Sequence, residues 1–311
     1  MYRSLLVPLD GSAFSEHALP LALSIARRAG ETLHLLYVQD LLPFEGAGQP
    51  PFPPLSPHLR QHELDYLHGV VERLRQLAPV TVMPLLLEGE VAATIRSAAE
   101  GTGVDLVVMT THGRGPLGRM WLGSVADRLL RDLPVPLLLV RPTEAAPELG
   151  REATVANIFL PLDGTPLAEQ MLAPARDLGA AMGAAFTLFR AVRPVVPLGF
   201  PAEGLGIGEA TQSLLDQAAK TEDRLQETAR AYLQRLATRW RAEGLSVRTA
   251  VAVEAQPAVA ILKEAAATTA DVIALATHGR HGVSRLFLGS VADKVIRAAS
   301  VPVLVHRPAS S

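Results

Sequence analysis

Residues 111–131 read THGRGPLGRMWLGSVADRLLR, and residues 277–297 read THGRHGVSRLFLGSVADKVIR. The wider segments 110–142 and 276–308 align at a constant offset of 166, with 17 of 33 positions identical. A period of about half the chain predicts a duplicated domain, because solenoid repeats run to only roughly 20 to 50 residues.

A second repeated segment marks the start of each copy. PLDGS at 8–12 matches PLDGT at 161–165 with an offset of 153, so the second copy carries 13 extra residues between its ends. We therefore expect two domains, residues 1–145 and 153–309.

Each copy alternates short β-rich apolar runs with longer segments of helical periodicity. The runs predict strands at Ser4–Leu9, Thr32–Gln39, Val80–Leu87, Val104–Thr111 and Val135–Val140, and at Asn157–Leu162, Ala185–Val192, Val247–Val253, Asp271–Thr277 and Val301–Val305. In the first copy, helices are predicted at Ala13–Ala29, Gln61–Leu77, Val91–Glu100 and Ser124–Arg131. This alternation predicts an α/β fold of two tandem doubly wound domains, each with a five-stranded parallel sheet, Rossmann-like or flavodoxin-like.

Prolines occur at matching places in both copies. Pro20 and Pro174 fall within the first helix of each copy, where we expect a bend. Two loops rich in proline and glycine, Leu41–Pro57 and Arg193–Gly208, follow the second strand of each copy. Each loop is either a lid over the ligand edge of the sheet or a plain surface loop.

Composition narrows the class of protein. Lys and Arg total 29 against 31 Asp and Glu, without a long block of either sign, so neither nucleic acid nor an anionic membrane is an expected partner. The absence of cysteine excludes disulfides and thiolate metal sites. No window approaches 18 uninterrupted apolar residues, and the start lacks an export signal. We expect a soluble cytoplasmic protein.

The repeated glycine segment has the pattern of a phosphate site. Parallel α/β sheets bind ligands at the carboxyl ends of their strands, where glycine amides and a helix N-terminus attract anions. In each copy, a glycine lies ten residues before a Gly-Ser pair that opens a helix. These residues are Gly113, Gly123 and Ser124 in the first copy, and Gly279, Gly289 and Ser290 in the second.

A purely structural interpretation competes with the phosphate site. Ser124 with Asp127, and Ser290 with Asp293, fit the capping box, in which both side chains satisfy helix-end donors. The loop glycines also suit any tight turn from strand to helix. Capping and phosphate binding can coexist, and the duplicated spacing favours a function.

Other polar residues repeat at the same sheet edge. Asp10 and Asp163 end the first strands, where each either accepts from a ribose hydroxyl or a base, holds a metal-bound water, or is a turn residue that caps the next helix. Arginines follow the loop glycine and either neutralise phosphate or remain solvated, and histidines precede it and either carry protons or brace the loop. These are Arg114, Arg119, Arg280, Arg285, His112 and His278.

Missing motifs exclude several enzymes. The chain has three lysines, none in the first copy, and no G-x-x-x-x-G-K-[ST] loop, which excludes a P-loop NTPase. It also lacks a G-x-S-x-G elbow and an H-E-x-x-H helix. We assign no catalytic and no metal-ligating residue. A binding protein is favoured over a slow ATPase, and a nucleotide-free scaffold is the third possibility.

The T-H-G-R segments, the nine-residue spacing to G-S-V-A-D and the opening P-L-D-G-S/T resemble the universal stress protein family in a tandem form, over nearly the whole chain. The resemblance implies an ATP-binding branch, with adenine and ribose near the first two strands and the triphosphate, with Mg²⁺, over the glycine loop. It also implies pairing through the last strands, so Val135–Val140 and Val301–Val305 would form an internal pseudo-dimer, with a homodimer as a further possibility.

Carried over by position, the resemblance assigns adenosine contacts to one set of residues and phosphate contacts to another. The adenosine set is Asp10, Val38, Asp163 and Ala191, and the phosphate set is Gly113, Gly123, Ser124, Gly279, Gly289 and Ser290. The first motif glycine is replaced by Thr110 in one copy and Ala276 in the other, and the glycine after the third strand, Gly89, becomes Ala255. These departures bear on whether both copies are occupied. The function expected from the resemblance is a nucleotide-responsive stress sensor or binding module.

Overall fold

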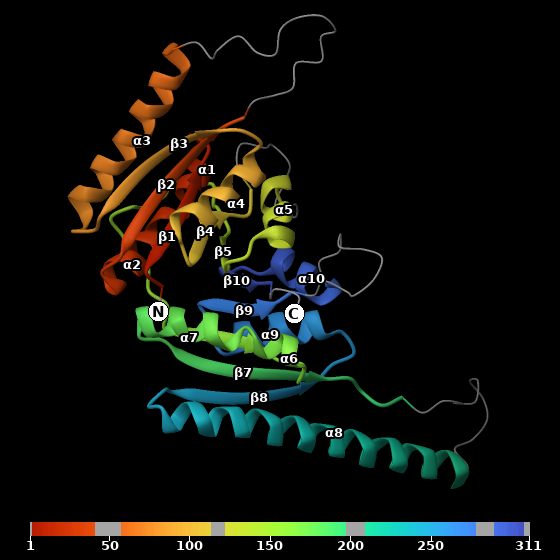
Figure 1. Ribbon diagram of the computed structural model, residues 1–311. Coiled ribbons are helices and arrows are strands. Elements are labelled where there is room, and N and C mark those ends of the chain that lie inside the picture. Colours follow the sequence, from red (N-terminus) through yellow and green to blue (C-terminus); the bar gives the residue numbers. More distant parts are fainter. Residues whose placement is uncertain (1, 41–56, 113–121, 197–208, 278–288, 308–311) are drawn as a thin grey trace, which may run out of the picture.

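The computed structural model describes residues 2–40, 57–112, 122–196, 209–277 and 289–307 (Figure 1). We call residues 1–145 the first half and residues 153–309 the second half. Both proline-rich loops lie largely outside the described residues.

The first half contains five strands and five helices within its described part. The strands are β1 (Ser4–Leu9), β2 (Thr32–Gln39), β3 (Val82–Glu88), β4 (Leu106–Thr110) and β5 (Leu137–Val140). The helices are α1 (Ala13–Glu16), α2 (Leu19–Ala29), α3 (Pro57–Leu77), α4 (Val91–Thr102) and α5 (Ser124–Asp132). All five predicted strands are confirmed, with bounds that differ by at most two residues.

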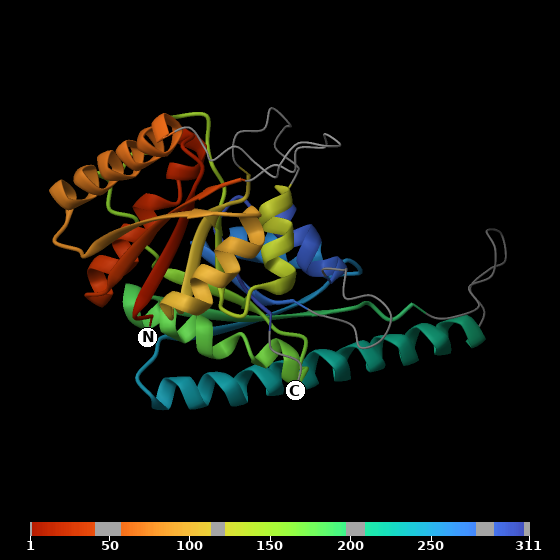
Figure 2. The same ribbon diagram turned by 45° about the horizontal axis from the view of Figure 1, so that its top comes forward.

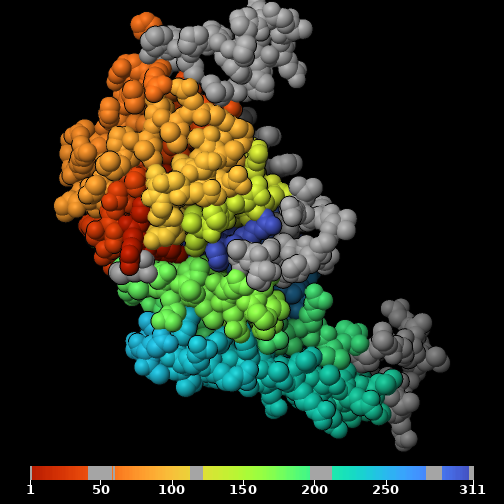
Figure 3. Space-filling model, in the orientation of Figure 1, coloured from red at the N-terminus to blue at the C-terminus, as the bar shows by residue number. Residues whose placement is uncertain are grey.

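The second half repeats the same order. Its strands are β6 (Asn157–Pro161), β7 (Ala185–Val192), β8 (Val247–Val253), β9 (Val272–Ala276) and β10 (Val303–His306). Its helices are α6 (Pro166–Glu169), α7 (Leu172–Met182), α8 (Glu209–Ala242), α9 (Pro257–Ala267) and α10 (Ser290–Ala298). At 34 residues, α8 is longer than its counterpart α3 at 21 residues, and it runs along one side of the molecule in Figures 2 and 3.

One ten-stranded sheet runs through both halves in the order β3-β2-β1-β4-β5-β10-β9-β6-β7-β8. Within each half every neighbouring pair is parallel, which confirms the predicted doubly wound α/β fold. The strand order reverses beside β1 and β6, so the ligand edge lies at the carboxyl ends of these strands and of β4 and β9.

The halves meet where β5 and β10 pair antiparallel, with Leu138 opposite Leu304. Both side chains are fully buried, so the last strand of each half, which would otherwise be an apolar edge, is covered by the other. A hydrogen bond also joins the two halves: the Tyr2 hydroxyl donates to the Pro174 carbonyl at 2.9 Å. The last strands therefore join the two halves through one continuous sheet.

Helices cover both faces of the sheet because the strands are apolar on both sides. One buried cluster lies between the sheet and helices α2, α3, α7 and α8. The other lies between the sheet and helices α4, α5, α9 and α10. Successive residues of a strand contribute to opposite clusters, as Leu35 and Leu36 of β2 do.

The prolines interrupt the first helix of each half more fully than the expected bend. Instead of one helix over Ala13–Ala29, α1 ends at Glu16 and α2 begins at Leu19, with Pro20 in its first turn. In the second half, Pro174 likewise falls in the first turn of α7. A proline is tolerated there because the first N–H groups of a helix have no intrahelical partner. Among the described residues, no helix is long and apolar enough to cross a membrane.

Candidate functional site

The aspartates after β1 and β6 hold the same turn in both halves. Asp10 Oδ1 accepts from the Ser12 amide at 2.9 Å and from the Ser12 hydroxyl at 2.6 Å. Asp163 Oδ1 accepts from the amide and hydroxyl of Thr165 at the same two distances. Ser12 and Thr165 in turn cap α1 and α6. The turn role uses Oδ1, and since a carboxylate has two oxygens, it is compatible with a ligand role.

Val38 and Ala191 lie beside these aspartates at the sheet edge. Leu9 is opposite Tyr37 in the β1–β2 register, so the next residues along, Asp10 and Val38, are neighbours at the carboxyl end. Pro161 is opposite Phe189, which brings Asp163 and Ala191 to the matching place. Both Val38 and Ala191 are half-buried and pack on the side of helices α4, α5, α9 and α10.

The end of β4 is bound to the start of α5. The Gly123 amide donates to the Thr111 carbonyl at 2.8 Å. A Cβ on Gly123 would lie 3.2 Å from that oxygen and 3.4 Å from the Cα of His112, so a side chain there would press on backbone. Glycine at this position therefore allows a close approach of helix start and strand end. Thr110 is buried within β4, whereas Ala276 of β9 is half-buried.

The capping-box interpretation of the serines is wrong. The N-cap positions of α5 and α10 are occupied by Gly123 and Gly289, which have no side chain to cap the helix. Ser124 and Ser290 are instead the first helical residues. The acidic members of the boxes pair within their own helices, Asp127 with Arg131 and Asp293 with Arg297. Both serines are exposed. Within the described residues, the amides at these helix starts are thus not capped by the predicted side chains.

His112 follows Thr111 at the mouth of the first glycine loop. Its Nδ1 lies 3.1 Å from the Thr111 hydroxyl oxygen. Burial, and secondarily the charge of Arg141, lower the pKa of His112 below its ordinary value. Both effects favour the neutral imidazole, which can share a hydrogen bond with the Thr111 hydroxyl.

Several predicted residues lie outside the described part of the chain. They are Gly113, Arg114, Arg119, His278, Gly279, Arg280 and Arg285. The described members of the site are Asp10, Val38, Thr110, His112, Gly123 and Ser124 in the first half, and Asp163, Ala191, Ala276, Gly289 and Ser290 in the second.

A tyrosine-carboxylate pair beside each aspartate was missed by sequence reasoning. The Tyr66 hydroxyl donates to Glu16 at 3.0 Å, and the Tyr232 hydroxyl donates to Glu169 at 3.0 Å. Burial is the largest cause that raises the pKa of both phenols, so they remain protonated donors. The internal repeat could have revealed both pairs, because Tyr66 and Tyr232 are 166 residues apart and Glu16 and Glu169 are 153 residues apart, the same offsets as the repeated segments.

The two pairs have different surroundings. In the first half, Arg73 donates to both oxygens of Glu16 at 2.9 and 3.0 Å. In the second half, Arg190 lies over the Tyr232 ring, 5.4 Å from its centroid, and its guanidinium is 2.8 Å from the position a Cβ of Gly164 would take. The second site thus has an arginine against the Asp163 turn where the first has Tyr37.

Two parallel doubly wound halves, each with an aspartate turn and a glycine-led helix start at its carboxyl edge, define a tandem α/β protein. The model of the universal stress protein family matches residues 1–141 and 154–307. The chain belongs to this family.

Relatives and solved structures extend the match. A universal stress protein of Mycolicibacterium smegmatis is 28% identical over 253 residues, which cover 80% of this chain and 76% of the relative. One from Thermus aquaticus is 32% identical over 146 residues, which cover 45% of this chain and 100% of the relative. The crystal structure of a universal stress protein from Archaeoglobus fulgidus is 19% identical, covers 98% of each chain and has a TM-score of 0.67. That likeness shows the shared fold.

Proposed function

We propose that this protein binds ATP, with Mg²⁺, at the carboxyl edge of one or both halves and acts in the cytoplasm as a nucleotide-responsive sensor or binding module of the stress response. Adenine and ribose would lie beside Asp10 and Val38 in the first half and beside Asp163 and Ala191 in the second. The phosphates would lie on the amides that begin α5 and α10. The resemblance to the ATP-binding branch of the family supplies this assignment.

The main support for the proposal comes from the N-terminal ends of helices α5 and α10. Each helix begins after a glycine at the N-cap position, and no side-chain cap hydrogen bond is made there. The first residue of each helix is an exposed serine. A helix start that is not capped by a side chain carries donors and a positive dipole end, which suit a phosphate oxygen. Because an aspartate turn lies at the same sheet edge, a ribose hydroxyl has an acceptor within the same site.

The residues fit Mg²⁺ as a companion of the phosphates. The described part of the chain contains no group of three or more His, Asp or Glu side chains that could hold a metal. Mg²⁺ often keeps several waters and takes its remaining ligands from substrate phosphates. The protein would therefore hold the ion through the nucleotide, and a serine hydroxyl such as that of Ser124 can contact it or its water.

Calorimetric titration of nucleotide-free protein with Mg-ATP tests the proposal. We expect saturable binding with up to two equivalents, and Gly113→Val and Gly279→Val should each remove one. Absence of saturable binding would refute the function, and unchanged stoichiometry in the double variant would refute the site assignment. A shift in thermal stability gives an independent measure, since ligand at about a hundred times its Kd adds roughly 2.7 kcal/mol.

Two further measurements separate this function from its alternatives. Steady phosphate release above that of the glycine variants would indicate an ATPase, whereas we expect no release above the variants. Mass spectrometry of the small molecules released from denatured protein should identify an adenine nucleotide. A scaffold without nucleotide would release none and would not shift in melting temperature.

A further inference from the structure

We propose that the phosphate end of the first-half site is composite: Arg297, which belongs to the second half, supplies a cation to phosphates bound at the start of α5. This inference rests on the proposed function. It assigns a phosphate-contacting role across the junction of the halves to a residue that sequence reasoning did not select.

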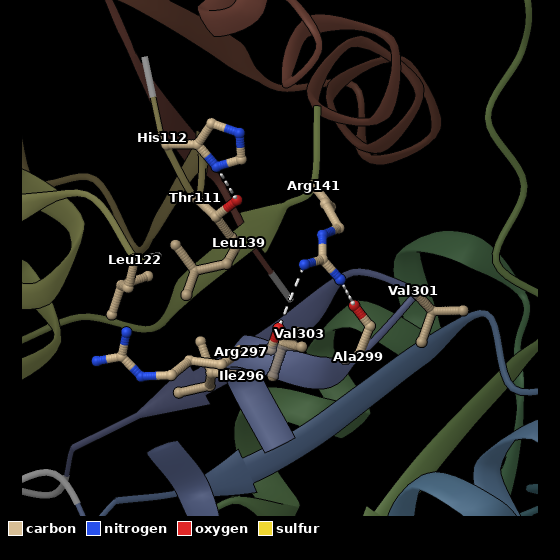
Figure 4. A pocket seen from close by; sticks show the side chains of 10 residues that line it. All are labelled: Thr111, His112, Leu122, Leu139, Arg141, Ile296, Arg297, Ala299, Val301 and Val303. Atoms are coloured by element: carbon tan, nitrogen blue, oxygen red, sulfur yellow. Dashed lines mark hydrogen bonds between the residues drawn. The ribbon is translucent and has the colours of Figure 1, made fainter. Parts of the chain in front are cut away.

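Arg297 lines a hollow at the junction of the two halves (Figure 4). The first half contributes Thr111, His112, Leu122, Leu139 and Arg141, and the second contributes Ile296, Arg297, Ala299, Val301 and Val303. In Figure 4 the Arg297 side chain runs from α10 toward Leu122.

The hollow adjoins the helix start to which we assign the phosphates. Leu122, which lines it, directly precedes Gly123, the N-cap of α5. Thr111, also in the lining, accepts the Gly123 amide hydrogen bond at 2.8 Å. A phosphate on the first amides of α5 would therefore lie next to Leu122, which lines the hollow together with Arg297.

The two arginines that line the hollow differ in which of their guanidinium nitrogens already donate hydrogen bonds. Arg141 Nη1 donates to the Ala299 carbonyl at 2.9 Å, and its Nη2 donates to the Arg297 carbonyl at 3.3 Å. The Arg297 guanidinium donates through Nε to Asp293 at 2.8 Å, and within the described residues it makes no other hydrogen bond. Its side chain is 35% exposed. Its two terminal nitrogens can thus turn to a phosphate while Nε stays on Asp293.

The counterpart of Arg297 in the first half is held by more of its own helix, which makes the arrangement asymmetric. Arg131 is the counterpart of Arg297 at the offset of 166. Its Nη2 pairs with the Asp127 carboxylate and its Nε donates to the Asp127 carbonyl at 3.3 Å, so both ends of the guanidinium are held on α5. The first-half site therefore gains a cation from the second half, but the second-half site does not gain one in return.

The test measures Arg297→Met in two backgrounds of the full chain. Asp163→Ala is expected to remove binding at the second-half site, so that only the first-half site is measured. Asp10→Ala is expected to remove binding at the first-half site, so that only the second is measured. In the Asp163→Ala background, Arg297→Met should weaken Mg-ATP binding roughly tenfold, as expected for loss of a charge-assisted hydrogen bond. Adenosine, which lacks phosphate, should bind as before. In the Asp10→Ala background, neither ligand should be affected.

Two further variants keep the result interpretable. Lys294→Met removes the same charge from an exposed position on α10 and should leave ATP binding unchanged. Arg297→Lys keeps the charge and should restore most of the affinity, which would not follow if Arg297→Met had only disturbed α10. An equal effect on ATP and adenosine, or in both backgrounds, would overturn the inference while the proposed function stands. Failure of the unmodified protein to bind ATP would overturn both.

Discussion

Arg141 of the first half donates a hydrogen bond from Nη1 to the carbonyl oxygen of Ala299, at 2.9 Å, just past the end of α10 in the second half. Cations are stabilising at a helix C-terminus, where the last carbonyls lack intrahelical partners. Arg307, the counterpart of Arg141, makes no such hydrogen bond with the described part of α5. Among the described residues, this arginine contact with the end of a helix is thus made from the first half only.

Arg141→Met should lower the free energy of unfolding by about 1–2 kcal/mol, because it removes charged hydrogen bonds to two carbonyls. Arg307→Met is the matched control and should change stability by less than about 0.5 kcal/mol, as expected for a surface substitution. Urea unfolding of both variants checks this. Equal effects would contradict the asymmetry of the junction.

Ser12→Ala and Ser124→Ala should separate a capping serine from a serine at a ligand site. Ser12 caps α1 and bonds Asp10, so its loss should cost about 1 kcal/mol of stability. Ser124 makes no cap, so its loss should change stability little but weaken Mg-ATP binding. Thermal unfolding and calorimetry of the two variants give the comparison. A larger stability loss for Ser124→Ala would restore the capping interpretation.

His306→Val should reduce the loss of stability in acid. Burial lowers the pKa of His306, and its buried Nδ1 has no hydrogen-bond partner among the residues that the structure describes. As pH falls below about 6.5, the unfolded imidazole takes up a proton that the folded one resists, so stability declines. Valine, which the first half has at this place as Val140, removes that proton uptake.

Urea unfolding at pH 7.5 and 5.5 measures the effect of His306→Val, with the two pH values chosen to lie on either side of roughly 6.5. The stability difference between the two pH values should be smaller in the variant than in the parent. His34 and His112, whose pKa values burial also lowers, leave part of the decline in place. An unchanged difference would show that His306 does not contribute.

Gly179→Ala and Gly101→Ala should have opposite effects, although both glycines lie in helices. A Cβ on Gly179 of α7 would lie 2.2 Å from the Phe186 ring, within the core, and should cost about 1–3 kcal/mol. A Cβ on Gly101 of α4 meets no atom within 4 Å, and alanine should add up to about 1 kcal/mol. Thermal unfolding of the pair checks both signs. Similar shifts would mean that packing against Phe186 is relaxed.

Local pattern predicted most of the fold. The strands were found because apolar runs such as that of β1 can only be buried between two layers of helices. The duplicated segments placed Asp10, Gly123 and Ser124 at the same sheet edge, since parallel strands bring their carboxyl ends together. The pairing of β5 with β10 was expected from the family resemblance, because nothing in the two strands themselves specifies the partner.

The errors arose where tertiary contacts compete with local rules. The Ser124-Asp127 capping box fits the sequence, yet Asp127 pairs with Arg131 and the Gly123 amide is bound by Thr111. The i, i+4 spacing of Asp127 and Arg131 is itself a local signal that competes with the capping box. Only the hydrogen bond from Gly123 to Thr111 depends on the position of β4 relative to α5.

By itself, the sequence determined that the chain is duplicated, that each copy is a parallel α/β unit and that glycines lead into the same helix of each, because composition, periodicity and spacing are local properties. Only the tertiary structure decided that Tyr66 meets Glu16, that Arg141 binds the end of α10 and that Arg297 lines the same hollow as Thr111 and Leu122. The two hydrogen bonds join residues 50 and 158 positions apart. The first depends on how α1 and α3 pack within one half, and the second depends on the pairing of β5 with β10, which aligns the two halves.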